Sequence, residues 1–139
     1  MPMPKDVGVI DLMLAVPGDD TSHFYEWIKP MLMDKESHDM FKMPAQYMFK
    51  DIPHTEKQED YIAYTLAQMD KHGIERAMIG VGKHSEVHAE ALRRHPDRFF
   101  GSYEANPNNG MDEVRAIVAM HEEFDIKAVT AAPSMICPP

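Results

Sequence analysis

Four short apolar runs divide the chain, and polar segments with helical periodicity lie between them. The runs cover residues 7–15, 76–82, 99–105 and 126–132, and the last three follow one another at intervals of roughly 25 residues. Short apolar runs of this length, separated by helical patterns, are typical of buried strands in a parallel sheet. The pattern predicts an α/β protein with parallel (β/α) units and about four strands.

Local signals place helices in the gaps between the later runs. Thr55 and Gln58 have the spacing of a capping box, and Gly73 is placed to end the helix that they begin. Residues 85–95 form a shorter predicted helix, which Pro96 stops. Each helix is expected to bury one stripe against the sheet.

A third helix is predicted to begin near Asp112. Its expected apolar stripe consists of Val114, Ile117, Val118, His121 and Phe124. His121 is expected on this stripe as a hydrogen-bonded core or boundary residue.

Residues 16–54 interrupt this rhythm, because a long segment separates the first strand from its helix. The segment contains four prolines and gathers methionine with aromatic residues, which together make an adaptable apolar surface. Segments of this length are usually functional, a partner contact or disordered. Two interpretations stay open: irregular lining of the core, or a lid or oligomer contact.

The predicted strands account for half of a closed barrel. A TIM-type (β/α)₈ barrel has eight strands and typically about 250 residues, whereas this chain has 139. An open four-stranded parallel sheet exposes an edge and an apolar face, which natural domains avoid. We therefore expect residues 1–139 to form a single partial (β/α) barrel domain, with residues 16–54 as an insertion, that completes its sheet with another segment or chain.

The net charge argues against some classes of ligand, and the cysteine content bears on the cellular compartment. Fourteen Lys and Arg against 23 Asp and Glu give a formal charge of -9, which argues against nucleic acid and anionic membranes as ligands. Cys137 has no second cysteine for an intrachain disulfide, and no apolar stretch approaches the roughly 18 residues of a membrane span. The expected location is the cytoplasm.

Three motifs stand at helix and strand positions of the predicted fold: HPDRFFGSYEANP at residues 95–107, FDIKAV at 124–129 and MDKHGIERA at 69–77. Together they resemble the amidohydrolase-related (amidohydrolase 2) TIM-barrel family, in the branch similar to aminocarboxymuconate-semialdehyde decarboxylase. The resemblance implies a hydrolase or decarboxylase that acts on a small organic acid or amide. It also implies a divalent, zinc-type metal in the complete family member.

The first strand departs from the family pattern. Family members usually read Asp-x-His-x-His there, and the two imidazoles bind the metal at the mouth of the barrel. Here Asp11 is kept, but Met13 and Ala15 stand at the two histidine positions. A thioether is a poor ligand for such an ion, and alanine offers no ligand atom. We therefore expect neither a metal ligand nor a cofactor on this chain.

Asp11 is a carboxylate within an apolar run, and two explanations stay open. It ties the strand end to backbone N–H groups or to a neighbouring basic side chain, since a buried charge must be paired. Alternatively, it is a catalytic residue at the mouth of the barrel.

Other candidate residues follow the later strands, where barrels of this kind carry their active sites. Glu104 with His84 is a candidate proton-transfer pair, or a contribution to a substituted metal site. Alternatively, Glu104 is a strand-end residue paired with Lys83. The predicted substrate-binding residues are Lys83, Asn106 and Ser134. A metal site at His84 and His88 is disfavoured, because Ser85 resembles a helix N-cap and would leave His84 outside the helix.

Two functions follow from these observations. The first is an amidohydrolase-related enzyme with a small-molecule substrate, of which this chain supplies the N-terminal half-barrel. The second is a non-catalytic half-barrel subunit that binds itself or a second half-barrel segment.

Overall fold

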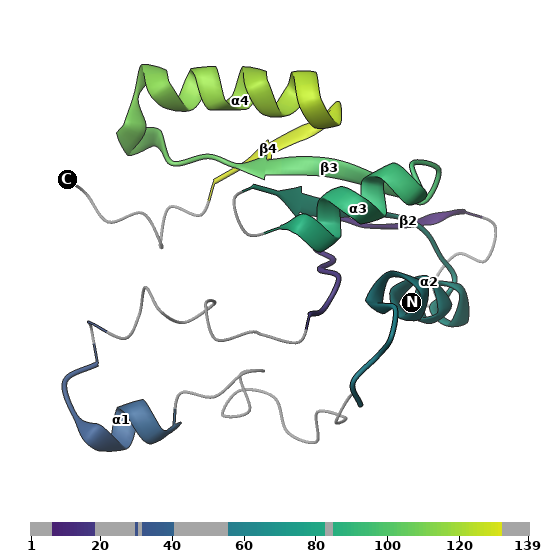
Figure 1. Ribbon diagram of the computed structural model, residues 1–139, viewed down its shortest axis with the longest axis horizontal. Coiled ribbons are helices and arrows are strands. Elements are labelled where there is room, and N and C mark those ends of the chain that lie inside the picture. The colour runs from purple at the N-terminus through teal and green to yellow at the C-terminus, as the bar shows by residue number, and fades with distance from the viewer. Residues whose placement is uncertain (1–6, 19–29, 31, 41–55, 83–84, 132–139) are drawn as a thin grey trace. The chain divides into compact units, whose positions relative to one another are not determined.

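The computed structural model describes residues 7–18, 30, 32–40, 56–82 and 85–131 (Figure 1). The chain divides into two compact units, residues 18–59 and residues 1–17 with 60–139. In the unit of residues 18–59, α1 (Lys35–Met40) is a short helix. Asp34 precedes this helix and accepts hydrogen bonds from the Ser37 N–H and hydroxyl. The other unit contains the remaining elements, which are β1 (Val9–Asp11), α2 (Tyr61–His72), β2 (Ile74–Val81), α3 (Glu86–Arg94), β3 (Phe99–Glu104), the 3₁₀ turn η3 (Pro107–Asn109), α4 (Met111–Phe124) and β4 (Ala128–Thr130).

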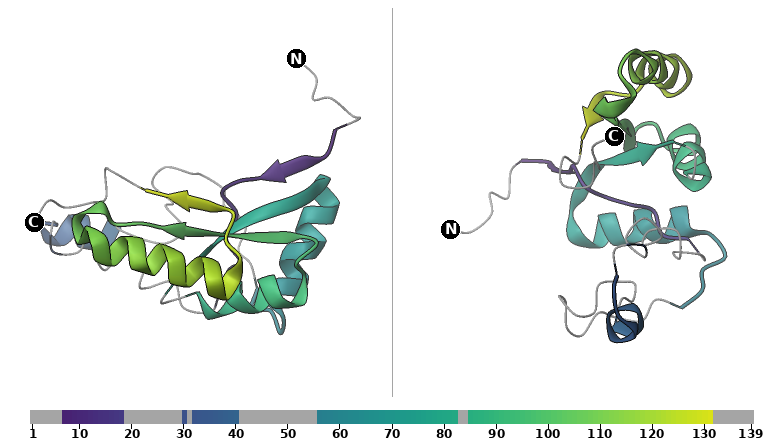
Figure 2. Two further views of the ribbon diagram at one scale, coloured as in Figure 1. Left: turned by 90° about the horizontal axis from the view of Figure 1, so that it is seen from above. Right: turned by 90° about the vertical axis from the view of Figure 1, so that its left-hand side faces the viewer.

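The four strands form one parallel sheet in the order β1-β2-β3-β4. Each connection moves the chain one strand further in the same direction. Because such crossovers are right-handed, they place α2, α3 and α4 on one face of the sheet, as Figure 2 shows. The sheet curls with these helices around it, so the predicted α/β half of a TIM-type barrel is confirmed. None of the helices in the described part of the chain is long and apolar enough to cross a bilayer.

The hydrophobic core lies between the sheet and its helices. Ala77, Ile79 and Phe99 are at most 1% exposed, and Ile62 and Met69 of α2 pack against them. A glycine allows α3 and the segment before β4 to approach the sheet: a Cβ added at Gly101 would lie 3.1 Å from Ile126 Cγ2 and 3.4 Å from Leu92 Cδ1. The helix-facing side of the sheet is therefore packed closely by this chain alone.

The start of α2 differs from the prediction, whereas its end agrees. Asp60 is the N-cap, and its Oδ1 accepts the N–H groups of Ile62 and Ala63 at 2.9 and 3.0 Å. The predicted capping box is wrong, because Gln58 precedes the helix and donates its side-chain amide to the Glu56 carbonyl; Thr55 lies outside the described residues. Gly73 ends the helix in the left-handed conformation with φ 70°.

The predicted second helix is present as α3. Ser85 occupies its N-cap position but caps no helical N–H. Its hydroxyl instead bonds to Gly82, accepting from the backbone N–H at 2.6 Å and donating to the carbonyl oxygen at 2.8 Å. Ser85 therefore closes the turn that leads from β2 into α3.

The buried stripe of α4 is shifted from the predicted one. Val114 and Val118 are 47% and 51% exposed, and Glu113 is the buried residue of this helix. The shift occurs because hydrogen bonds hold the Glu113 carboxylate against the preceding loop. His121 is hydrogen-bonded, with Nδ1 3.2 Å from the Ile126 carbonyl oxygen, but it is exposed rather than part of the core.

Candidate functional site

Alternation along the strands gives the sheet two different faces. We call the face packed by α2, α3 and α4 the covered face, and the opposite one the open face. The register places Ile10 beside Arg76, Met78 beside Phe100, and Glu104 beside Thr130. Among the described strand residues, the open face consists of Ile10, Arg76, Met78, Gly80, Phe100, Ser102, Glu104, Ala128 and Thr130. In a closed barrel this face would line the interior.

Glu104 ends β3 on the open face. Its side chain is exposed, and it forms no hydrogen bond or ion pair with any residue that the structure describes. The carboxyl ends of parallel strands are where barrel enzymes place their reacting groups. Among the described residues predicted to be catalytic, Glu104 is the one at the carboxyl end of a strand on the open face.

A buried carboxylate holds the loop that follows Glu104. Glu113 Oε1 accepts the backbone N–H of Asn106 at 2.9 Å, and Oε2 accepts the side-chain amide of Asn109 at 2.6 Å. The Asn109 amide, followed by the Asn106 N–H and the Tyr103 hydroxyl, lowers the pKa of Glu113. Burial, together with the bond to Glu113, raises the pKa of Tyr103. Glu113 thus anchors the loop between β3 and α4.

The sequence analysis did not identify this role of Glu113. Its only local signal was an acidic residue in the first turn of a helix, a common position with a favourable helix dipole. The groups that it binds come from a loop whose path the sequence pattern does not specify.

Asn106 is exposed and its polar groups are used in this loop. Its side-chain oxygen accepts the N–H of Asn108 at 3.0 Å, which caps η3, while its own N–H donates to Glu113. Asn106 therefore lies two residues beyond Glu104 in a fixed turn, with its side-chain NH₂ still available as a donor.

Asp11 lies on the other face of the sheet. Its register partner is Ala77, which is fully buried on the covered face. Asp11 Oδ1 accepts the backbone N–H of Met13 at 2.9 Å, so the carboxylate ties the end of β1 to its own turn. The structure does not bring Asp11 and Glu104 together.

Three other predicted site residues, Lys83, His84 and Ser134, lie outside the described residues. The pairing of His84 or Lys83 with Glu104 stays a prediction, and so does substrate binding by Lys83 and Ser134. In the sequence, Lys83 and His84 follow Gly82, the residue after β2.

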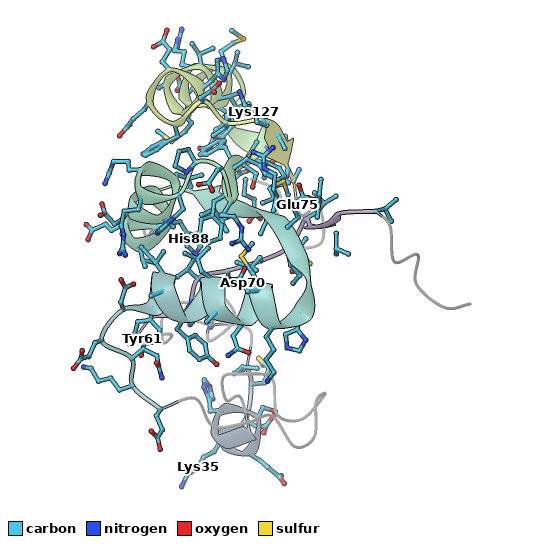
Figure 3. The ribbon with its side chains drawn as sticks, turned by 90° about the vertical axis from the view of Figure 1, so that its right-hand side faces the viewer. Lys35, Tyr61, Asp70, Glu75, His88 and Lys127 are labelled. Carbon is cyan, nitrogen blue, oxygen red and sulfur yellow. The ribbon has the colours of Figure 1, made fainter. Side chains whose placement is uncertain are left out.

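His88 joins two segments instead of facing a ligand (Figure 3). Its Nδ1 is 2.6 Å from the carbonyl oxygen of Gly80, and its Nε2 accepts the N–H of Val16 at 3.0 Å. This arrangement assigns the proton to Nδ1 and uses both ring nitrogens. His88 fastens the chain after β1 to the end of β2, and it has no lone pair left for a metal.

The first strand does not fit the metal of the family that the motifs resemble. Met13 is 94% exposed and offers only a thioether, and the exposed Ala15 has no ligand atom. Within the described ranges, no three His, Cys, Asp or Glu side chains gather as a metal site would require. Asp11 faces away from the open face.

The comparisons with protein-family models, with curated proteins and with solved structures give no match. The resemblance to the amidohydrolase-related family therefore depends on the three motifs and on where they lie in the fold.

Proposed function

We propose that this chain is half of a (β/α)₈ barrel enzyme similar to the amidohydrolase-related family, and that the enzyme hydrolyses or decarboxylates a small organic acid or amide. The observation that carries the proposal is the position of Glu104. It is an exposed carboxylate without a described partner, at the carboxyl end of a strand and on the face that a closed barrel would enclose.

The places of the three motifs support this proposal. Residues 69–77 span the end of α2 and the start of β2, residues 95–107 lead into β3 and its loop, and residues 124–129 lead from α4 into β4. Each motif thus includes residues that lead into a strand, which supports the proposal.

The proposed chemistry uses Glu104 as the group that transfers a proton to or from the substrate. Its exposure leaves it free to contact a ligand, while Glu113 holds the following loop so that the strand end keeps its position. His84 is the proposed second proton carrier. Lys83, Asn106 and Ser134 are the proposed contacts to a carboxylate or amide of the substrate. Asp11, tied to Met13, supports the strand end.

Turnover by the native protein tests the proposal. Protein isolated from its source, so that any second half is present, would be assayed with a panel of small carboxylic acids and amides, with and without added divalent metal. We expect turnover, and we expect Glu104→Gln to lower kcat by about 10²-fold or more. Glu122→Gln, which changes an exposed glutamate of α4, is the matched control and should leave kcat unchanged. No turnover on the panel would contradict the proposal.

A second candidate is a non-catalytic half-barrel subunit, and the exposed apolar residues at the β4 side favour it. Met111, Val114 and Val118 of α4 and Val129 of β4 are 47–65% exposed. Scattered apolar residues are common on surfaces, but contiguous ones mark contacts. A stable complex with a second chain that shows no turnover would select this function over the first.

A further inference from the structure

One arginine differs from all the others in the chain. Arg76 forms no ion pair with any described residue, and its guanidinium lies over the ring of Phe100, 5.4 Å from the centroid. The other four arginines each pair with a carboxylate at 2.5–2.9 Å, namely Arg93, Arg94, Arg98 and Arg115. The contact with Phe100 orients the guanidinium but leaves its five N–H donors without described acceptors.

Arg76 lies toward the amino end of β2 on the open face, far from the carboxyl ends of the strands. It is the third residue of β2, and Val81 ends this strand five residues later. At about 3.3 Å per residue, Arg76 is roughly 17 Å from the edge at which Glu104 lies. A small substrate at that edge does not reach Arg76, so a substrate group there does not supply its acceptor.

The described part of the open face has no carboxylate for it. Glu104 is the acidic residue on that face, and it lies four residues beyond Phe100, about 13 Å along the strand. In a closed barrel Arg76 would be enclosed, and an enclosed cation is costly unless it is paired and hydrogen-bonded.

An identical second copy does not supply the missing charge. Two copies that close a barrel around a two-fold axis place β2 of one opposite β2 of the other. The two Arg76 side chains then approach each other in the same interior layer. Like charges in such an enclosed space repel strongly. The half-barrel that completes this one must therefore differ from it at this layer.

We infer that the open face is closed by a second half-barrel that carries an Asp or Glu on its inward side, opposite Arg76. The planar guanidinium, held over Phe100, presents its donors to that carboxylate and forms an interior ion pair. This inference rests on the half-barrel architecture of the proposed function, and it adds the chemistry of the partner.

A charge-swapped copy of the chain serves as the probe. The full chain with Arg76→Glu has the same sheet and places a carboxylate in the opposing layer. Wild-type and Arg76→Glu chains carrying different mass tags would be mixed, and native mass spectrometry and sedimentation would measure their association. We expect a one-to-one complex at least tenfold tighter than either chain with itself. Arg115→Glu makes the same charge change on the exposed surface of α4 and should give no such gain.

A second variant keeps the inference testable if Arg76→Glu does not fold. Arg76→Leu removes the like-charge contact without adding a carboxylate, and it should self-associate more tightly than the wild-type chain. Circular dichroism and thermal unfolding establish that each variant is folded.

Two results would overturn the inference. If the wild-type chain binds itself as tightly as it binds Arg76→Glu, the two chains still associate, but Arg76 does not form the inferred ion pair. No association in any mixture would overturn closure of the open face by a half-barrel of this shape with a carboxylate opposite Arg76, and the turnover assay with Glu104→Gln would still decide the catalytic proposal separately.

Discussion

The two faces of the same sheet differ in what this chain provides for them. Phe99 and Phe100 are neighbours in β3, yet Phe99 is 1% exposed in the core and Phe100 is half-buried beneath Arg76 on the open face. On the covered face, Ala77, Ile79 and Phe99 are buried in the core with residues of α2 and α3 of the same unit. On the open face, Arg76 and Glu104 form no ion pair with any described residue, and Ile10 is 52% exposed.

Because of this difference, we expect the covered face to determine stability and the open face to determine function. The covered face gives the half-barrel its own core, so the unit has packing that does not depend on a partner. The open face carries Glu104 and Arg76, on which the proposed chemistry and the proposed ion pair depend. Changes on the two faces should therefore have different consequences.

The largest expected effect is at Phe99. Phe99→Ala should lower the free energy of unfolding by about 3–5 kcal/mol, because it leaves a cavity in the packed core. Phe100→Ala should cost under about 1 kcal/mol in the isolated chain, since its ring has solvent on one side. Urea denaturation followed by circular dichroism measures both. Similar losses at the two positions would mean that the faces do not differ.

Substitutions at two glycines, one on each face of the sheet, test the same comparison. Gly101→Ala should destabilise the fold by about 1–3 kcal/mol, because the added methyl group meets Ile126 and Leu92. Gly80→Ala, for which no atom lies within 4 Å of the added Cβ, should change stability by less than about 0.5 kcal/mol. Thermal unfolding of the two variants would show this order, and the reverse order would contradict the assigned faces.

A smaller and more local effect is expected at Glu113. Glu113→Gln weakens the acceptors of the Asn106 N–H and the Asn109 amide, so the loop after β3 should open more often. Amide hydrogen exchange at Asn106 should become faster, while exchange in α2 should not change. Because the folded-state pKa of Glu113 is lowered, its contribution is present above the ordinary value of 4.5 and is lost as the pH falls. Unchanged exchange at Asn106 would show that Glu113 does not hold this loop.

The smallest effect in this series is expected at Asp60, away from both faces. The bond to Arg94, with the capped N–H groups, lowers the pKa of Asp60 to about 2. Its stabilisation is therefore complete above 3.8 and is lost as the pH falls through about 2. Stability of the wild-type chain should decrease over this range, and the decrease should be shallower in Asp60→Asn. Identical pH profiles would show that Asp60 does not contribute.

The sequence was sufficient to predict the order of strands and helices but not the contacts between distant segments. Gly73 ended its helix as predicted because the left-handed conformation is a local requirement. Thr55 and Asp60 are both capable N-caps, and local pattern favoured Thr55. The choice of Asp60 involves an ion pair with Arg94, 34 residues away, which no local pattern shows.

The candidate site was predictable to the same extent. Glu104 could be placed at a strand end from the apolar run before it. The face of Asp11 could not be predicted, because β1 has three residues and its register shifts between Val9 and Ile10. One residue of shift reverses every side chain of a strand. Burial of Glu113 in place of Val114 likewise depended on loop hydrogen bonds.

The accessibility of adjacent positions in β2 tests the central claim most directly. A thiol would be introduced by Met78→Cys on the open face or by Ile79→Cys on the covered face, each with Cys137→Ser so that the chain has one reactive group. In dilute protein, we predict rapid labelling at position 78 and labelling at position 79 only as fast as the protein unfolds. Equally slow labelling at both positions would contradict the account, because this chain alone would then cover both faces of its sheet.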